Sequence, residues 1–112
     1  MLTLDKKMRR RARELSGIAY ERELYQELSG LAKKFDLWRN KEIGSGELSI
    51  FVHEYERGAS RRLFTFYNNI KPELCVARAV ALNLLTKEEI GKELLEVLGE
   101  SIRFFEEDPA DG

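Results

Sequence analysis

Apolar residues recur every three or four positions along most of the chain, a spacing that predicts helices and no strands. The first such pattern runs from Leu4 to Trp38 and is interrupted by the polar Glu21. We expect a first helix over residues 4–39, with Gly17 and Gly30 as the points where it could loosen. The apolar positions of this stripe are Leu4, Met8, Ala12, Leu15, Ile18, Tyr25, Leu28, Ala32, Phe35 and Trp38.

A second helical pattern follows the break at Gly44-Ser45-Gly46 and ends at Asn68-Asn69. Ser45 is suited to the N-cap, because its hydroxyl can accept a hydrogen bond from a free backbone N–H of the first turn. The apolar residues of this helix form one stripe at sevenfold spacing: Leu48, Val52, Tyr55, Ala59, Leu63, Phe66 and Ile70.

The last third of the chain predicts two more helices. Pro72 suits the first turn of a helix that reaches about Leu85, and the segment 74–85 is apolar on nearly every side. Thr86 and Glu89 form a capping box that starts a fourth helix, predicted to run without a break from about Lys87 to about Glu106. We expect the acidic tail, residues 106–112, to be frayed.

The composition is that of one globular domain. The 112 residues are 43% hydrophobic and 35% charged, and a chain of this length can bury a core. The expected fold is all-α, a compact bundle of four or five helices over residues 1–112, with the 74–85 helix at its centre. Cys75 lies within that apolar helix, so we expect a buried, reduced thiol and a cytoplasmic protein. No apolar stretch is long enough for a membrane span, and we expect no membrane partner.

The net charge of −1 conceals a basic beginning and an acidic end. Residues 1–13 hold six basic side chains, while residues 86–112 hold nine acidic and three basic ones. The basic patch could pair with Glu93, Glu96 and Glu100 of its own or a second chain, bind phosphates, lie on an anionic membrane, or stay solvated. Its residues are Lys6, Lys7, Arg9, Arg10, Arg11 and Arg13.

The stretch FVHEYERGASRRLF, residues 51–64, holds the most chemically varied side chains. A His-Glu pair suggests a zinc protease, but that motif needs a second histidine four residues on, where Arg57 stands. His53 is the only histidine and Cys75 the only cysteine, so we expect no metal site and no cofactor. Since the nucleophile–base–orienter set of acyl transfer is also missing, we expect no enzyme activity.

On a helical wheel, the side opposite Tyr55 mixes polar residues with the apolar Ile50 and Phe64. Either the helix bends at Gly58 and turns its second half around, or this side packs against something, since such a mixture is typical of interfaces. The candidate partner-binding residues are His53, Glu54, Arg57, Arg61, Phe64 and Tyr67. The alternative interpretation is an ordinary wet face, on which Glu54 pairs with Arg57 and Arg61 while a partly buried His53 makes a hydrogen bond.

The segment from Val52 to Asn68, VHEYERGASRRLFTFYN, resembles a motif of small uncharacterised bacterial helical proteins, roughly I-H-E-F-H-x-G-P-A-R-x-L-x-x-x-Y-N. It departs from that pattern at Glu56, where the motif has a second histidine, and at Ala59, where it has proline. The resemblance implies a helix break at Gly58 and carries no assigned activity. The matching residues are His53, Glu54, Tyr55, Gly58, Arg61, Leu63, Tyr67 and Asn68.

These features together predict a small non-enzymatic interaction or regulatory protein. A first helix of about 35 residues would be ~50 Å long, much longer than a compact domain with a radius of gyration of about 13 Å. Unless it breaks, we expect its basic end to project, and residues 4–19 to lie across a second subunit in a homodimer. The alternative is a nucleic-acid-associated protein that uses residues 6–13.

Overall fold

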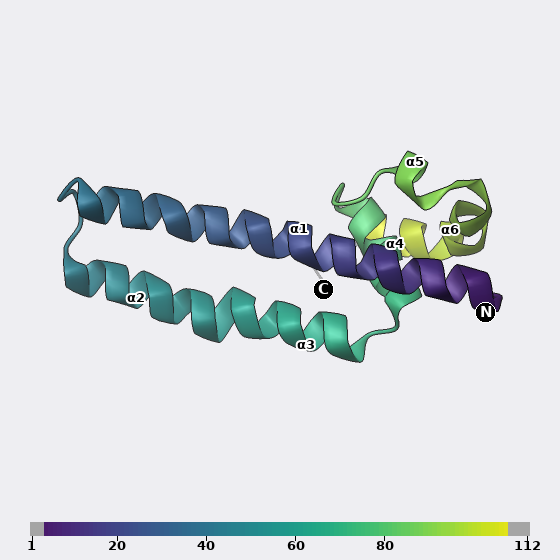
Figure 1. Ribbon diagram of the computed structural model, residues 1–112, viewed down its shortest axis with the longest axis horizontal. Coiled ribbons are helices and arrows are strands. Elements are labelled where there is room, and N and C mark those ends of the chain that lie inside the picture. Colours follow the sequence, from purple (N-terminus) through teal and green to yellow (C-terminus); the bar gives the residue numbers. More distant parts are fainter. Residues whose placement is uncertain (1–3, 108–112) are drawn as a thin grey trace.

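The computed structural model describes residues 4–107 and confirms the all-α class, with no strand in that range. The helices are α1 (Lys6–Arg39), α2 (Ser45–Tyr55), the π-helical turn η1 (Glu56–Ser60), α3 (Arg61–Asn69), α4 (Pro72–Ala81), α5 (Lys87–Ile90) and α6 (Lys92–Glu107). Figure 1 shows α1 running antiparallel to the rod formed by α2, η1 and α3, while α4, α5 and α6 gather near the N-terminal end of α1. The predicted tail beyond Glu107 lies outside the described residues.

α1 is one unbroken helix of 34 residues. Its start is fixed by Asp5, whose carboxylate accepts a hydrogen bond from the backbone N–H of Met8 at 2.8 Å. Neither Gly17 nor Gly30, the two points where the helix could have loosened, interrupts it, because the helix continues through both. It ends at Arg39, and Lys41 then turns the chain with a positive φ of 62°.

The core confirms the central place of the third predicted helix. α4 packs against α1 and against α6, and its residues from Cys75 to Val80 are buried. The helix is shorter than expected, however, because Asn83 has a φ of 62° and ends it at Ala81. Leu84 and Leu85 are still buried, from the turn that follows.

The fourth predicted helix is two helices. The capping box at Thr86 and Glu89 forms as expected, but α5 stops at Ile90. Gly91 has a φ of 89°, a conformation that L side chains rarely adopt, and the chain changes direction before α6 begins at Lys92. An unbroken helix over residues 87–106 is therefore not present.

The molecule is longer than a compact bundle of this size. Its Cα radius of gyration is 16.9 Å and its extents are 53 × 26 × 24 Å, against about 13 Å for the radius of a compact 112-residue domain. The projecting part is the C-terminal half of α1 with α2, η1 and α3, a two-helix arm spanning residues 20–69 (Figure 1).

The basic end of α1, by contrast, does not project. Leu4, Ala12 and Leu15 are buried in the core of their own chain, and Met8 packs against it. The proposed contact of residues 4–19 with a second subunit loses its basis, because the apolar side chains that required a cover already have one.

Candidate interaction surfaces

The turn at Gly58 decides how the arm presents its side chains. Instead of the expected break, residues Glu56–Ser60 form one turn of π-helix, which holds about one residue more than an α-helical turn. The extra residue rotates all of α3 relative to α2 while the rod continues (Figure 1). Arg61 accordingly pairs with Glu56, five residues earlier, at 3.1 Å. The expected pairs of Glu54 with Arg57 and Arg61 are not among the ion pairs of residues 4–107.

An open groove of about 620 Å³ lies along η1 and α3. Arg57, Arg61 and Arg62 line it together with Thr65 and Asn69. Two of the candidate partner-binding residues, Arg57 and Arg61, thus lie in one groove, and Arg62 joins them. Arg62 could have been found from sequence as the third member of the basic run, but only the rotated register brings all three to one side. The apolar Phe66 and Ile70 line the groove as well.

The other candidates of this stretch do not line the groove. His53 and Glu54 are exposed on α2, so the partly buried histidine of the alternative interpretation is wrong. Phe64 is 61% exposed on α3, an unusual position for a phenylalanine.

Tyr67 lies apart from that surface, in a polar cluster between three helices. Its hydroxyl donates a hydrogen bond to Glu23 on α1 at 2.7 Å, and its ring stacks on Tyr20 with centroids 4.8 Å apart. Both terminal nitrogens of Arg78 on α4 donate to the same carboxylate at 3.0 Å. Burial, with the neighbouring Glu23 carboxylate, raises the pKa of Tyr67 well above its usual value. Tyr67 is therefore a neutral residue that joins α3 to the core.

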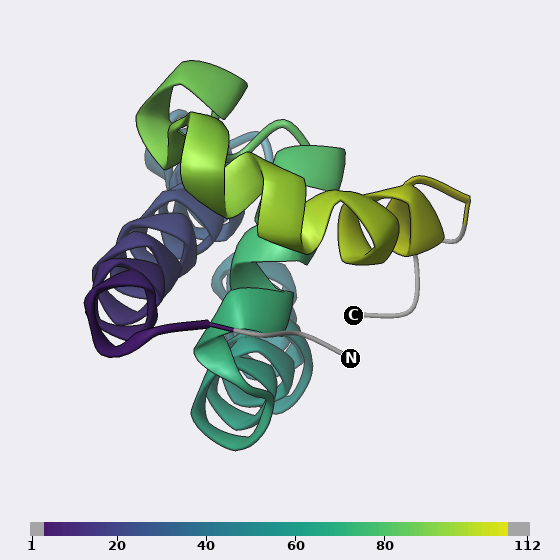
Figure 2. The same cartoon turned by 90° about the vertical axis from the view of Figure 1, so that its right-hand side faces the viewer.

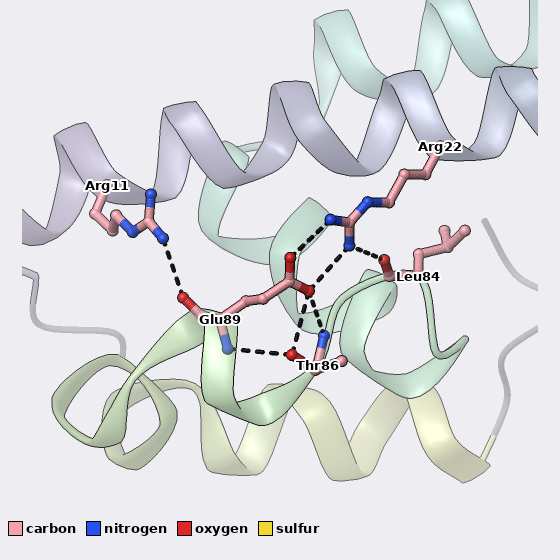
Figure 3. A network of polar contacts seen from close by, with 5 residues as sticks. All are labelled: Arg11, Arg22, Leu84, Thr86 and Glu89. Atoms are coloured by element: carbon pink, nitrogen blue, oxygen red, sulfur yellow. Dashed lines mark hydrogen bonds and ion pairs between the residues drawn. The ribbon is translucent and has the colours of Figure 1, made fainter.

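A second polar network ties α1 to α5 (Figure 3). Arg22 donates to both oxygens of Glu89, at 2.9 and 2.7 Å, and to the carbonyl oxygen of Leu84 at 2.8 Å. Glu89 also accepts from the backbone N–H of Thr86 at 2.9 Å. The hydrogen bond from Arg22, helped by that from Thr86, lowers the pKa of Glu89 to about 2.

One residue of the basic patch, Arg11, also contacts this part of α5. Arg11 donates to the backbone oxygen of Glu89 at 3.1 Å and pairs with Glu14 at 3.7 Å. Among residues 4–107, no ion pair joins the patch to Glu93, Glu96 or Glu100. The other basic residues of the patch remain exposed: Lys6, Lys7, Arg9, Arg10 and Arg13.

The apolar stripe of the arm is exposed. Four of the apolar positions from which the first helix is predicted, Ile18, Tyr25, Leu28 and Phe35, are 38%, 68%, 45% and 36% exposed. With Ala32 they share one side of α1, which we call the outer stripe; Glu21 is the polar position between Ile18 and Tyr25. An exposed apolar face of this type marks an interaction site more often than it is left in solvent.

The described part of the chain has no helix long and apolar enough to cross a membrane. In the same residues, no three histidine, cysteine or acidic side chains are grouped closely enough to hold a metal ion. The chain matches no known family model, no curated protein and no solved structure.

Proposed function

We propose that this protein is a small, non-enzymatic interaction or regulatory protein of the cytoplasm, which acts as a homodimer through the helical surfaces of its arm. The observation that carries the proposal is the outer stripe, an apolar face on a long straight helix with no covering element in residues 4–107. Within the same proposal, the chain belongs with the small bacterial proteins whose motif resembles Val52–Asn68.

The arginine groove of η1 and α3 is the proposed site for a different protein partner. A groove lined by three arginines and two apolar residues suits an acidic segment with one or two apolar side chains, because Arg binds carboxylates in a bidentate manner. The exposed Phe64 and His53 would extend this contact along α3 and α2.

The test is co-purification of the tagged protein from its native host, with bound proteins identified by mass spectrometry. We expect at least one partner that is retained by wild type and lost by the triple variant R57E/R61E/R62E. The control K87E/K92E/R103E makes the same charge change on α5 and α6, away from the groove, and should keep the partner. Identical partner sets for all three proteins would exclude the groove as a binding site.

The alternative function, a nucleic-acid-associated protein, is favoured by one observation: all six basic side chains of residues 6–13 are exposed. Each phosphate contact would release counterions, so binding should weaken steeply with salt. A gel-shift assay with a generic duplex at low salt tests it, with R9E/R10E/R13E as the comparison. A duplex that does not shift at low salt rules this alternative out.

A further inference from the structure

The outer stripe is part of a regular heptad pattern along α1. One position of the repeat is occupied by Ile18, Tyr25, Ala32 and Arg39, and the other by Glu21, Leu28 and Phe35. Along the helix, the step from one of these residues to the next alternates between three and four residues. Alternating steps of this kind are the spacing by which two helices pack side by side. From Ile18 to Arg39 this face is about 32 Å long at 1.5 Å per residue.

The rest of the chain packs on the other sides of this helix. Near its beginning, α1 turns Ala12, Leu15 and Ala19 into the core shared with α4 and α6. Farther along, Glu27, Gly30 and Lys34 line a groove shared with α2, and the Lys34 ammonium lies 4.5 Å from the Phe51 ring centre. Figure 2 shows α4, α5 and α6 above and to the right of α1, so its lower-left side has no helix against it.

We infer that the outer stripe binds the same stripe of a second copy, with the two α1 helices antiparallel about a two-fold axis level with residue 30. This inference rests on the homodimer in the proposed function and names its surface and register. In an antiparallel pair, the two heptad positions face each other. About this axis, residues whose numbers add up to 60 are opposite, so Tyr25 faces Phe35 of the partner subunit and Leu28 faces Ala32 of the partner subunit.

The register also places opposite charges against each other. The two charged members of the heptad, Glu21 and Arg39, are both exposed, and their numbers add up to 60. Each Glu21 therefore faces Arg39 of the partner subunit, once at each end of the contact. A parallel pairing would instead place Glu21 against Glu21 of the partner subunit and Arg39 against Arg39 of the partner subunit, and such like-charge contacts disfavour it.

The area suits a dimer of moderate strength. An aromatic side chain has roughly 200 Å² to bury, so the exposed fractions of Tyr25, Phe35 and Leu28 leave roughly 300 Å² of apolar surface per subunit on that scale. Since interfaces are about 60% apolar, the total contact comes to roughly 1,000 Å², at the lower end for specific complexes. We expect a dissociation constant in the micromolar range.

Sedimentation equilibrium over a micromolar concentration series measures the dimer. We expect wild type to dimerise, E21R and R39E each to weaken association at least tenfold, and the double variant E21R/R39E to recover most of it. The control K33E changes an exposed residue of α1 that lies at neither of the two heptad positions, and it should leave the dimer unchanged. Circular dichroism verifies that each variant keeps its helices, which these exposed positions should allow.

Cysteine cross-linking tests the register. Positions 21 and 39 should form a disulfide between subunits when E21C and R39C are mixed and oxidised, whereas either variant alone should not. In E21C alone, the two cysteines would be about 27 Å apart along the helix axis, far beyond the Cα separation of about 7 Å that a disulfide tolerates. Wild type, with its buried Cys75, is the background control.

Cross-linking of either single variant by itself would indicate parallel helices and overturn the register. A wild-type protein that stays monomeric at all concentrations, or a dimer that ignores charge reversal at both positions, would overturn the inference itself. If the protein is monomeric and E21R fails to retain a co-purifying protein that wild type retains, the outer stripe binds that protein instead of a second copy. The arginine-groove comparison is independent of these results, so its partner can persist when the dimer fails.

Discussion

Among single residues, Glu23 has the most demanding position in the structure. It is nearly buried, and its carboxylate accepts hydrogen bonds from both Arg78 and Tyr67, which come from two other helices. Arg78 is also almost fully buried, with its guanidinium 4.7 Å from the Phe66 ring centre. Removal of one partner leaves the other charge uncompensated in a poorly solvated place, and this costs more than the intact pair contributes.

We therefore expect Glu23→Ala to lower the free energy of unfolding by about 3–5 kcal/mol, measured by urea denaturation. Glu27→Ala, one turn along the same helix at an exposed position, is the control and should change it by less than about 0.5 kcal/mol. A loss below about 1 kcal/mol for Glu23→Ala would mean that Arg78 finds solvent or another acceptor.

Glu89 permits a prediction on pH. Because its pKa in the folded protein is lowered to about 2, its bonds to Arg22 and Thr86 stabilise the fold above the ordinary glutamate range of about 4.3. That contribution decreases as the pH falls from about 4.5 towards about 2. We expect the difference in Tm between wild type and Glu89→Gln to be constant above pH ~5 and to shrink below it. A difference that does not depend on pH would contradict the ion pair.

At the scale of elements, two helix starts follow the local chemistry that the sequence shows, and the internal turns do not. Pro72 in the first turn of α4 and the Thr86–Glu89 box are predicted from sequence, because each acts within three or four residues. The predicted N-cap Ser45 is wrong, because α2 has Gly44 as its N-cap and Ser45 as its first residue. The break at Gly91 is hidden, since Ile90 and Leu94 keep a helical spacing across it. The only sign of the break in the sequence is Gly91 itself, because other residues avoid the conformation that the break requires.

Gly91→Ala should destabilise the protein by about 1–3 kcal/mol, because φ 89° with ψ 155° is a backbone region nearly restricted to glycine. Gly99→Ala is a matched comparison, since it lies inside α6 and an added Cβ would meet nothing within 4 Å. That change should stabilise the protein by about 0.5–1 kcal/mol through the better helix propensity of alanine. Thermal unfolding of both variants measures the difference, and equal effects would argue against the break.

For the whole molecule, the outline depends on where α1 leaves the core. Its first half contributes Leu4, Ala12, Leu15 and Ala19 to the packing around α4, while its second half has only the α2–η1–α3 rod beside it. Each helix of a two-helix arm has one neighbour, so an apolar side that does not face that neighbour is left in solvent. The exposed outer stripe follows from this geometry.

Small-angle X-ray scattering at concentrations below the expected dimer range should give a radius of gyration of about 17 Å, following the 16.9 Å of the Cα atoms. A compact bundle would give about 13 Å. The larger value separates an extended arm from one folded back on the core. A value near 13 Å at low concentration would contradict the arm.

The sequence alone determined what depends on neighbours a few residues away: the helical class, the approximate bounds of α1, the start of α4 and the burial of Cys75. These properties arise from hydrogen bonds and caps within one turn and from apolar content, all of which are local.

Only the tertiary structure decided which side of each helix is covered. A stripe such as Ile18 to Phe35 has the same spacing whether it meets its own chain, a second chain or water, so periodicity could not separate these cases. The π-turn likewise leaves steps of three and four intact while it rotates α3, sending Tyr67 to Glu23 and gathering Arg57, Arg61 and Arg62 in one groove. Spacing records the period of a helix, whereas burial depends on what packs against it.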